Sequence, residues 1–207
     1  MLTKLNRLDT IKLYPLLPLY VYNHDEDEYD YKYPNVFESY IFTIDSKSFK
    51  GHIKVLAAEL ARLTGELGYN KLVFLGDTEV AWLSQENRYD PVKKAQEYLE
   101  YNKVGKGFNG SILVEISEVI LFIRHLSWMI RCNASLPCFY FIDGGQNLLG
   151  YICQYGNLHV STLNKMTDNL IQDFLKVSSF RRLAVNNCYN RFGKTSAIPG
   201  RQTKIEL

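Results

Sequence analysis

The apolar run at residues 111–132 constrains the fold more than any other stretch, and a second apolar region, residues 137–160, follows directly behind it. Residues 111–116 carry β-branched side chains after an Asn-Gly pair, which predicts a short strand that begins at a turn. From Ser117, a predicted N-cap, the side chains are apolar nearly all round, as in a buried helix. Charged residues interrupt every window of about 20 residues in this run, which argues against a membrane span. We therefore expect this helix to form the centre of a soluble domain.

The remaining patterns predict an α+β fold, with an antiparallel sheet of hairpins and a meander and with helices packed on one face. A chain of 207 residues with 46% apolar and 22% charged residues has the composition of a globular protein, and we expect one domain at residues 1–178. The predicted strands lie at residues 11–22, 37–44, 111–116, 138–142, 147–154 and 158–162, with a hairpin at 71–83, and the predicted helices at residues 49–67, 91–102, 117–132 and 164–177.

Helix, hairpin and helix follow one another twice, at residues 49–102 and at residues 117–177. The similarity indicates either an old duplication, with two α-β-β-α pseudo-repeats side by side on one sheet, or coincidence, because units of a hairpin and a helix are common. Both interpretations stay open at the level of the sequence.

The charge is unevenly distributed along the chain. Lys, Arg, Asp and Glu give −4 for residues 1–100, +1 for residues 101–178 and +5 for residues 179–207. The last segment is predicted to be a basic C-terminal extension. It either grips nucleic acid phosphates through nonspecific charge or is a loosely held tail. Its basic residues are Arg181, Arg182, Arg191, Lys194, Arg201 and Lys204.

The N-terminus and the cysteines both indicate a cytoplasmic protein. The apolar stretch at residues 13–22 is interrupted by Pro15 and Pro18, and no small-residue cleavage site follows it, so we expect no cleaved leader. Four cysteines in a chain with this much apolar sequence do not resemble a disulfide scaffold, and we expect the three that lie in apolar segments to be reduced and buried.

An acidic, tyrosine-bearing segment at residues 24–34 is the first candidate site. Five carboxylates in six positions repel one another, which predicts a solvated loop. The same charges could instead dock on a basic surface of a partner protein, with the tyrosines as aromatic anchors. Calcium is a third interpretation, although the glycine and the distal glutamate of a helix-loop-helix site are not at the right spacing. The candidate partner-binding residues are Asp25, Glu26, Asp27, Glu28, Tyr29, Asp30, Tyr31 and Tyr33.

The second candidate is an anion-binding group on the predicted central helix, formed by Arg124, His125, Trp128 and Arg131. Guanidinium groups beside an indole can hold a phosphate or a carboxylate. The alternative is that the arginines pair with internal carboxylates and that the tryptophan is simply packed, because arginines on a buried helix need partners.

Motifs for catalysis or for a resident metal are absent from the sequence. No serine lies in a nucleophile elbow, and the cysteines lie in apolar surroundings that raise the pKa of a thiol. Zinc chemistry would need the meander to fold back so that Cys132, Cys138, Cys153 and His159 converge, but their spacing matches no zinc template. We therefore predict no catalytic residue, no metal and no cofactor.

These observations favour a non-enzymatic protein-binding module, such as an inhibitor or immunity-type protein that neutralises a partner with a basic surface through the acidic segment. One alternative is a small-ligand or anion-binding protein, or an enzyme, that uses the arginine and histidine residues of the central helix. Another is nucleic-acid binding through the basic tail.

Overall fold

A computed structural model, which describes residues 2–184, 188–193 and 197–203, confirms the α+β fold. Within these ranges, eight strands form one antiparallel sheet in the order β1-β6-β5-β7-β8-β9-β4-β10, and β2 and β3 pair as a separate hairpin. The strands are β1 (Thr3–Leu5), β2 (Leu19–Asn23), β3 (Glu28–Lys32), β4 (Glu38–Thr43), β5 (Lys71–Gly76), β6 (Ser111–Glu115), β7 (Phe139–Asp143), β8 (Leu148–Ile152), β9 (Leu158–Thr162) and β10 (Arg181–Arg182). The predicted meander is present as β7, β8 and β9, which are neighbours in the sheet.

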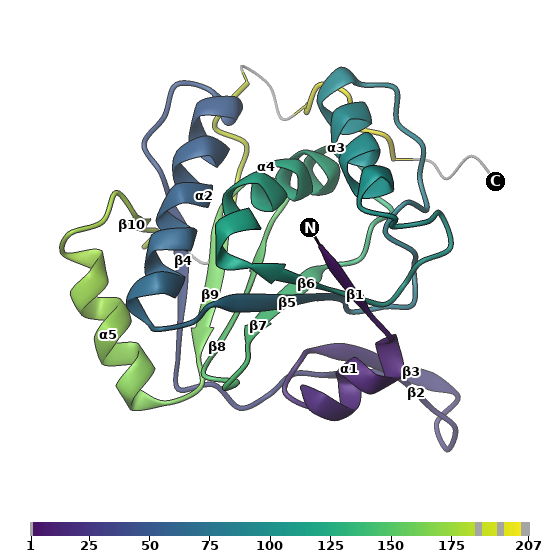
Figure 1. Ribbon diagram of the computed structural model, residues 1–207, viewed down its shortest axis with the longest axis horizontal. Helices are drawn as coiled ribbons and strands as arrows, with labels where there is room; N and C mark the ends of the chain where they lie inside the picture. The colour runs from purple at the N-terminus through teal and green to yellow at the C-terminus, as the bar shows by residue number, and fades with distance from the viewer. Residues whose placement is uncertain (1, 185–187, 194–196, 204–207) are drawn as a thin grey trace.

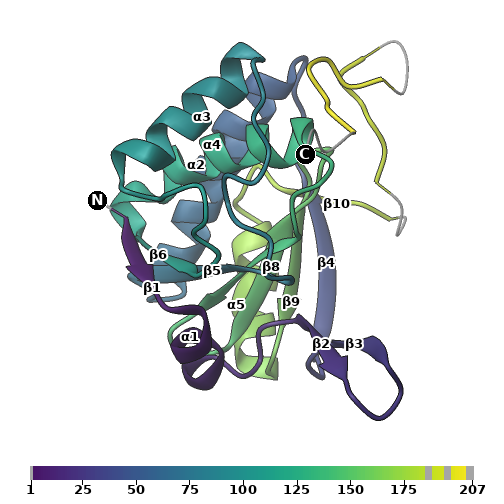
Figure 2. The same cartoon turned by 90° about the vertical axis from the view of Figure 1, so that its right-hand side faces the viewer.

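The helices are α1 (Arg7–Leu13), α2 (Phe49–Glu66), α3 (Asp90–Tyr101), α4 (Ile116–Cys132) and α5 (Lys165–Leu175). Helix α4 packs against both α2 and α3, and the three lie together over one face of the sheet (Figure 1). Helix α1 and the β2–β3 hairpin lie on the opposite face (Figures 1 and 2). Side chains cap three of the described helices, as is common for polar residues at helix starts: Asn6 Oδ1 accepts from Leu8 N in α1, Ser48 Oγ from Gly51 N in α2, and Asn164 Oδ1 from Thr167 N in α5.

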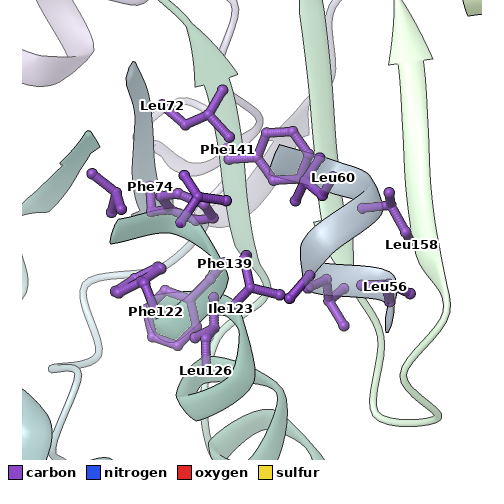
Figure 3. Close-up of a cluster of buried hydrophobic side chains, with 14 of the residues drawn as sticks. Leu56, Leu60, Leu72, Phe74, Phe122, Ile123, Leu126, Phe139, Phe141 and Leu158 are labelled. Carbon is purple, nitrogen blue, oxygen red and sulfur yellow. The ribbon is translucent and has the colours of Figure 1, made fainter. Parts of the chain in front are cut away.

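The main core fills the space between the sheet and the helices (Figure 3). Phe74 of β5 packs against Phe122 of α4 with ring centroids 4.7 Å apart, and against Phe141 of β7 with centroids 5.4 Å apart. Leu56 and Leu60 of α2 close the same cluster, and all five side chains are buried. Each such side chain stabilises the fold by about 1.5–3 kcal/mol through burial.

A second, smaller cluster lies on the opposite face of the sheet. Leu17 and Leu19, which lead into the β2–β3 hairpin, pack there against Val73, Leu75 and neighbouring side chains of the central strands. Ile11 of α1 also contacts this cluster. Both faces of the central strands are therefore covered, the first by helices and the second by α1 and the start of the hairpin.

Two predicted strand regions are wrong. Residues 11–22 do not form one strand, because Asn6 caps α1 by accepting from Leu8 N, and β2 begins only at Leu19. Residues 78–83 form no strand, so the predicted hairpin at residues 71–83 is absent. The reason is that β5 is already paired on both sides, by β6 and by β7, and offers no free edge to a hairpin partner. The first of the two proposed α-β-β-α units thus lacks its second strand.

The long central helix also differs from its prediction. Helix α4 begins at Ile116 with Glu115 in the N-cap position, so that Ser117 lies inside the first turn and is not the cap. The helix is not buried all round, because the side chains of Ile120 and Leu121 are about 40% exposed. Among the described residues, no helix is both long and apolar enough to cross a membrane.

Candidate functional site

The acidic segment forms a projecting hairpin, and we call residues 19–33 the tyrosine hairpin. Its two strands pair antiparallel with Tyr20 opposite Tyr31 and Tyr22 opposite Tyr29. Because side chains alternate along a strand, the four rings share one face. The centroids of the Tyr20 and Tyr31 rings lie 4.7 Å apart, and those of Tyr22 and Tyr29 lie 5.2 Å apart. These four tyrosines and Tyr33 are between 38% and 67% exposed, so they form an open row of aromatic side chains.

The carboxylates lie at the tip of this hairpin and on its other side. Asp25 and Asp27 belong to the four-residue turn, where Asp27 has a φ of 55°, a conformation that aspartate tolerates better than most residues. The hydroxyl of Tyr22 donates to Asp27, and Asn23 Nδ2 donates to Asp30 at 3.1 Å. The prediction of a loop at residues 24–34 is therefore wrong for residues 28–32, which form β3. Pairing of alternating tyrosines outweighs the repulsion between the charges, which the turn and the strand ends leave in solvent.

Hydrogen bonds attach the tyrosine hairpin to the sheet. The hydroxyls of Tyr31 and Tyr140 are 2.6 Å apart, and that of Tyr33 lies 3.2 Å from Ser161 Oγ. Burial raises the pKa of Tyr31 to about 12 and raises that of Tyr140 further, so both hydroxyls stay protonated near neutral pH. The base of the hairpin is thus held in place, while its tip extends away from the helices (Figure 2).

An open cavity of about 710 Å³ adjoins the base of the hairpin. It lies over β4, β8 and β9, and we call it the sheet cavity. The residues that line it include Tyr33, Ser39, Ile41, Tyr151, His159 and Arg182. Its wall therefore combines aromatic rings and hydroxyls with one imidazole and one guanidinium group.

Next to this cavity, Cys153, His159 and Cys188 converge into a group that we call the thiol–imidazole cluster. Their Sγ and ring nitrogen atoms all lie within 4.8 Å of one another, and Cys188 Sγ lies 3.3 Å from His159 Nε2. Hydrogen bonds with Cys153 and His159 lower the pKa of the Cys188 thiol, and the bond with Cys188 raises that of Cys153.

The sequence identified only part of this cluster. It grouped Cys153 and His159 with Cys132 and Cys138, but Cys132 is buried at the end of α4 and Cys138 lies where β7 begins. The glycine turn between Cys153 and His159 was a usable signal, because a tight turn brings its two flanks together. Cys188 joins from a segment 29 residues further along the chain than His159, and no local pattern marks it.

Of the four candidate anion-binding residues on α4, Trp128 and Arg131 share a neighbour, and His125 contacts a different one. The guanidinium of Arg131 is buried, lies 4.1 Å from the centroid of the Phe49 ring, and donates to the Gln154 carbonyl oxygen. Trp128 packs edge-on against the same Phe49 ring. His125 instead stacks on Tyr98 of α3 with centroids 4.5 Å apart.

The surroundings of this helix also bear on ligand binding. Burial, and to a smaller extent Arg124, lower the pKa of His125, which favours a neutral ring. The space that His125 lines with neighbouring apolar side chains has no room for a water molecule. Arg131 donates its other described hydrogen bond to Asn190 Oδ1 at 3.0 Å, so its guanidinium already serves to hold the chain's own C-terminal segment.

Described arginines of the basic extension contact the body of the protein. Arg182 lies over the Tyr40 ring at 4.6 Å, and Arg191 donates to the carbonyl oxygen of Ile44 at 2.7 Å. Arg201 donates to the carbonyl oxygen of Arg131. Lys194 and Lys204, which belong to the same predicted extension, lie outside the described residues.

No protein-family model, curated protein or solved structure matches this chain.

Proposed function

We propose that this protein is a non-enzymatic binding module whose tyrosine hairpin recognises a basic surface on another protein, in the manner of an inhibitor or immunity-type protein. The observation that carries the proposal is the row of exposed tyrosines on a hairpin whose tip is acidic. Five large rings at 38% to 67% exposure form an amphipathic surface of the kind that is enriched at protein interfaces.

The chemistry of the row supports a protein partner. Tyrosine has few rotatable bonds, so it supplies contact area at a low cost in conformational entropy, and it is enriched among the residues that dominate binding energy. The contacts of Tyr31 with Tyr140 and of Tyr33 with Ser161 fix the base of the row before any partner arrives. Such preorganisation reduces the ordering cost of association.

The charge of the hairpin supports a basic partner. Its turn and β3 carry five carboxylates, and one oxygen each of Glu26, Glu28 and Asp30 lie within 4.8 Å of one another. Placing like charges this close is unfavourable in the free protein and becomes favourable opposite lysines or arginines. An exposed acidic patch also accelerates encounter with a basic surface, in a manner that salt suppresses.

Site-specific photo-crosslinking tests the proposal. A photoreactive phenylalanine analogue replaces Tyr29, which is 67% exposed on the hairpin, or Tyr101, which is 87% exposed on α3 and serves as the control. In cells that express the protein, we expect a defined crosslinked protein from position 29 that is absent from position 101. The crosslinked species is then identified, purified and titrated with the wild-type protein in solution.

Charge-matched variants give the quantitative result. The combined changes Asp25→Asn, Asp27→Asn and Asp30→Asn are expected to weaken binding of the purified partner about 10-fold, and Tyr29→Ala about 30-fold. The control removes the same number of charges from α3, by Asp90→Asn with Glu97→Gln and Glu100→Gln. Equal crosslinking from both positions, or equal affinity of the two charge variants, would overturn the proposal.

A further inference from the structure

Cys153, His159 and Cys188 come together from three separate segments. Cys153 follows β8, His159 lies within β9, and Cys188 belongs to the described C-terminal segment at residues 188–193. All three side chains are partly buried, and their Sγ and ring nitrogen atoms lie within 4.8 Å of one another. Two thiols and an imidazole are the donors that Zn²⁺ and similar thiophilic ions prefer.

The spacing of these atoms fits one ion. With Zn–S bonds of about 2.3 Å and Zn–N bonds of about 2.0–2.1 Å, tetrahedral angles place two sulfurs about 3.8 Å apart and a sulfur and a nitrogen about 3.6 Å apart. The observed distance between Cys188 Sγ and His159 Nε2 is 3.3 Å, and no pair in the cluster exceeds 4.8 Å. Closing the set on an ion thus requires side-chain shifts of about 1 Å or less.

The structure around the cluster holds two of its members in place. Cys153 N donates to the carbonyl oxygen of Asn157 at 3.0 Å, and Gly156 N donates to the carbonyl oxygen of Cys153 at 2.8 Å. Gly156 has a φ of 84°, which glycine adopts without strain, so the turn between Cys153 and His159 closes without backbone strain. The ring of Tyr151 stacks on His159 with centroids 4.3 Å apart and fixes the plane of the imidazole.

We propose that Cys153, His159 and Cys188 bind a Zn²⁺ ion and leave a fourth coordination position for water or for a small oxygen- or nitrogen-donor ligand that enters from the sheet cavity. His159 belongs to the cluster and also lines that cavity, so the cavity reaches one of the three donor side chains. Three protein ligands with one open position are the arrangement of zinc sites that exchange ligands, whereas purely structural zinc sites have four protein ligands.

A disulfide and a nucleophilic pair are two other kinds of chemistry that this cluster could support, and each would use only two of the three side chains. A disulfide between Cys153 and Cys188 would leave the imidazole without a role, although His159 Nε2 is within hydrogen-bond distance of Cys188. A Cys188–His159 nucleophilic pair would leave the Cys153 thiol without a role. A bound zinc ion uses all three donor atoms and also attaches the segment around Cys188 to the sheet.

Metal titration of the whole, reduced protein tests the inference. After removal of bound metal with a chelator, Co²⁺ is added as a spectroscopic probe, and Zn²⁺ affinity is measured by competition. We expect the protein to bind one equivalent of Co²⁺, with thiolate charge-transfer absorption and with the intense visible bands of a tetrahedral ion.

Cys188→Ser and His159→Asn should each weaken the affinity at least ~100-fold, since loss of a direct ligand exceeds the 10- to 100-fold effect typical of outer-shell changes. Cys138→Ser, which alters a partly buried thiol outside the cluster, should leave binding unchanged.

A stability measurement separates loss of the ligand from loss of the fold. Without metal, wild type and Cys188→Ser should unfold at similar temperatures, and Zn²⁺ should raise the midpoint of the wild type alone. Imidazole added to the Co²⁺ form should shift the visible bands, because it enters the open position. Absence of metal binding by the reduced wild type, or equal affinity in wild type and Cys188→Ser, would overturn the site. Isolation of a Cys153–Cys188 disulfide form that binds no metal after reduction would do the same, and bands that imidazole does not shift would refute the open position.

Discussion

The two faces of the sheet use the same strands for different purposes. On the helix-covered face, β7, β8 and β9 contribute Phe141, Leu148 and Leu158, all of them fully buried apolar side chains. On the opposite face, the character changes across the sheet. Apolar side chains such as Leu149 lie at the centre, whereas in β9, towards β4, Ser161 is paired with Leu149 and His159 with Tyr151.

This difference separates stability from recognition. The helix-covered face gains its energy from close packing, which tolerates little change in shape. The opposite face is apolar where α1 and the base of the hairpin cover it, and it carries hydroxyls and an imidazole where it opens into the sheet cavity. The tyrosine hairpin and the thiol–imidazole cluster therefore lie on the side of the sheet that packing leaves available for binding.

Truncating the helix-covered core should produce the largest loss of stability. Phe141 is fully buried between Phe74 and the glycine at position 150, so Phe141→Ala leaves a cavity that neighbouring strands cannot refill. We expect a decrease of about 3–5 kcal/mol in the free energy of unfolding, measured by urea denaturation. Tyr101→Ala on the exposed side of α3 is the control and should change it by less than about 0.5 kcal/mol. A similar loss in both variants would contradict the role of Phe141 in the packed core of the helix-covered face.

A buried carboxylate where β7 ends should contribute less than the core but more than a surface group. Asp143 Oδ1 accepts from Asn147 N and from Leu148 N at 2.7 Å, and Oδ2 accepts from Gly145 N at 2.8 Å. Asp143→Ala removes these acceptors from three N–H groups, of which that of Leu148 is buried, and we expect a loss of about 1–3 kcal/mol in the same denaturation experiment. The exposed carboxylate of Asp173, changed to Ala, should cost less than about 0.5 kcal/mol. Equal effects would show that water replaces Asp143 in the turn.

Local signals in the sequence predicted the elements that depend on neighbouring residues. The periodic spacing of apolar residues predicted α2 and α5, and the glycine turns predicted the meander. These local signals do not predict which strands pair when the strands are far apart in the sequence. The placement of β5 between β6 and β7, which removed the expected hairpin at residues 71–83, is decided by strands that lie 35 to 72 residues further along the chain.

The same distinction between local and long-range signals applies to the candidate sites. The acidic and aromatic residues of the tyrosine hairpin are contiguous, so composition alone marked them, although charge repulsion suggested a loop where cross-strand tyrosine pairs form strands. The thiol–imidazole cluster depends on a contact between β9 and a segment beyond residue 187, for which the sequence holds no periodic or spacing signal. The arginines and aromatic residues of α4 were recognised as a group, yet tertiary packing directs His125 and Arg131 to different neighbours.

Low pH should destabilise the protein because a buried histidine of α2, His52, must take up a proton. His52 is fully buried, with Nδ1 3.1 Å from the Ile44 carbonyl oxygen and Nε2 2.8 Å from that of Gly156. Burial is the largest effect on the pKa of His52 and lowers it. The hydrogen bonds with the two carbonyl groups raise this pKa, and the nearby charges of Arg191 and Arg131 lower it. The unfolded chain, with a histidine pKa of about 6.5, therefore takes up a proton first as the pH falls.

The sign of the pH effect follows from that order of protonation. The contribution of His52 is fully present above about pH 6.5 and is lost as the pH falls towards the folded pKa, by about 1.4 kcal/mol for each pH unit that separates the two values. Urea unfolding at pH 7.5 and at pH 5, with a chelator present, measures the loss. His52→Gln should reduce the difference between the two pH values, and His24→Gln, on the exposed turn of the hairpin, should not. A difference that persists in His52→Gln would assign the effect to other groups, such as His125.

The smallest effect should come from the contact that attaches the tyrosine hairpin to the sheet. Tyr140→Phe removes the hydroxyl that lies 2.6 Å from the Tyr31 hydroxyl, and Tyr31, being partly exposed, can turn to water instead. We expect a loss of about 0.5–1.5 kcal/mol in global stability together with faster amide exchange in β2 and β3, because the hairpin loses a restraint that the sheet does not need. Tyr101→Phe, which removes a hydroxyl from a fully solvated ring, is the matched control and should leave both measurements unchanged. Faster exchange in β7 and β8 rather than in the hairpin would mean that this hydroxyl pair supports the sheet itself, and the hairpin would then be a part of the packed structure instead of a surface held ready for a partner.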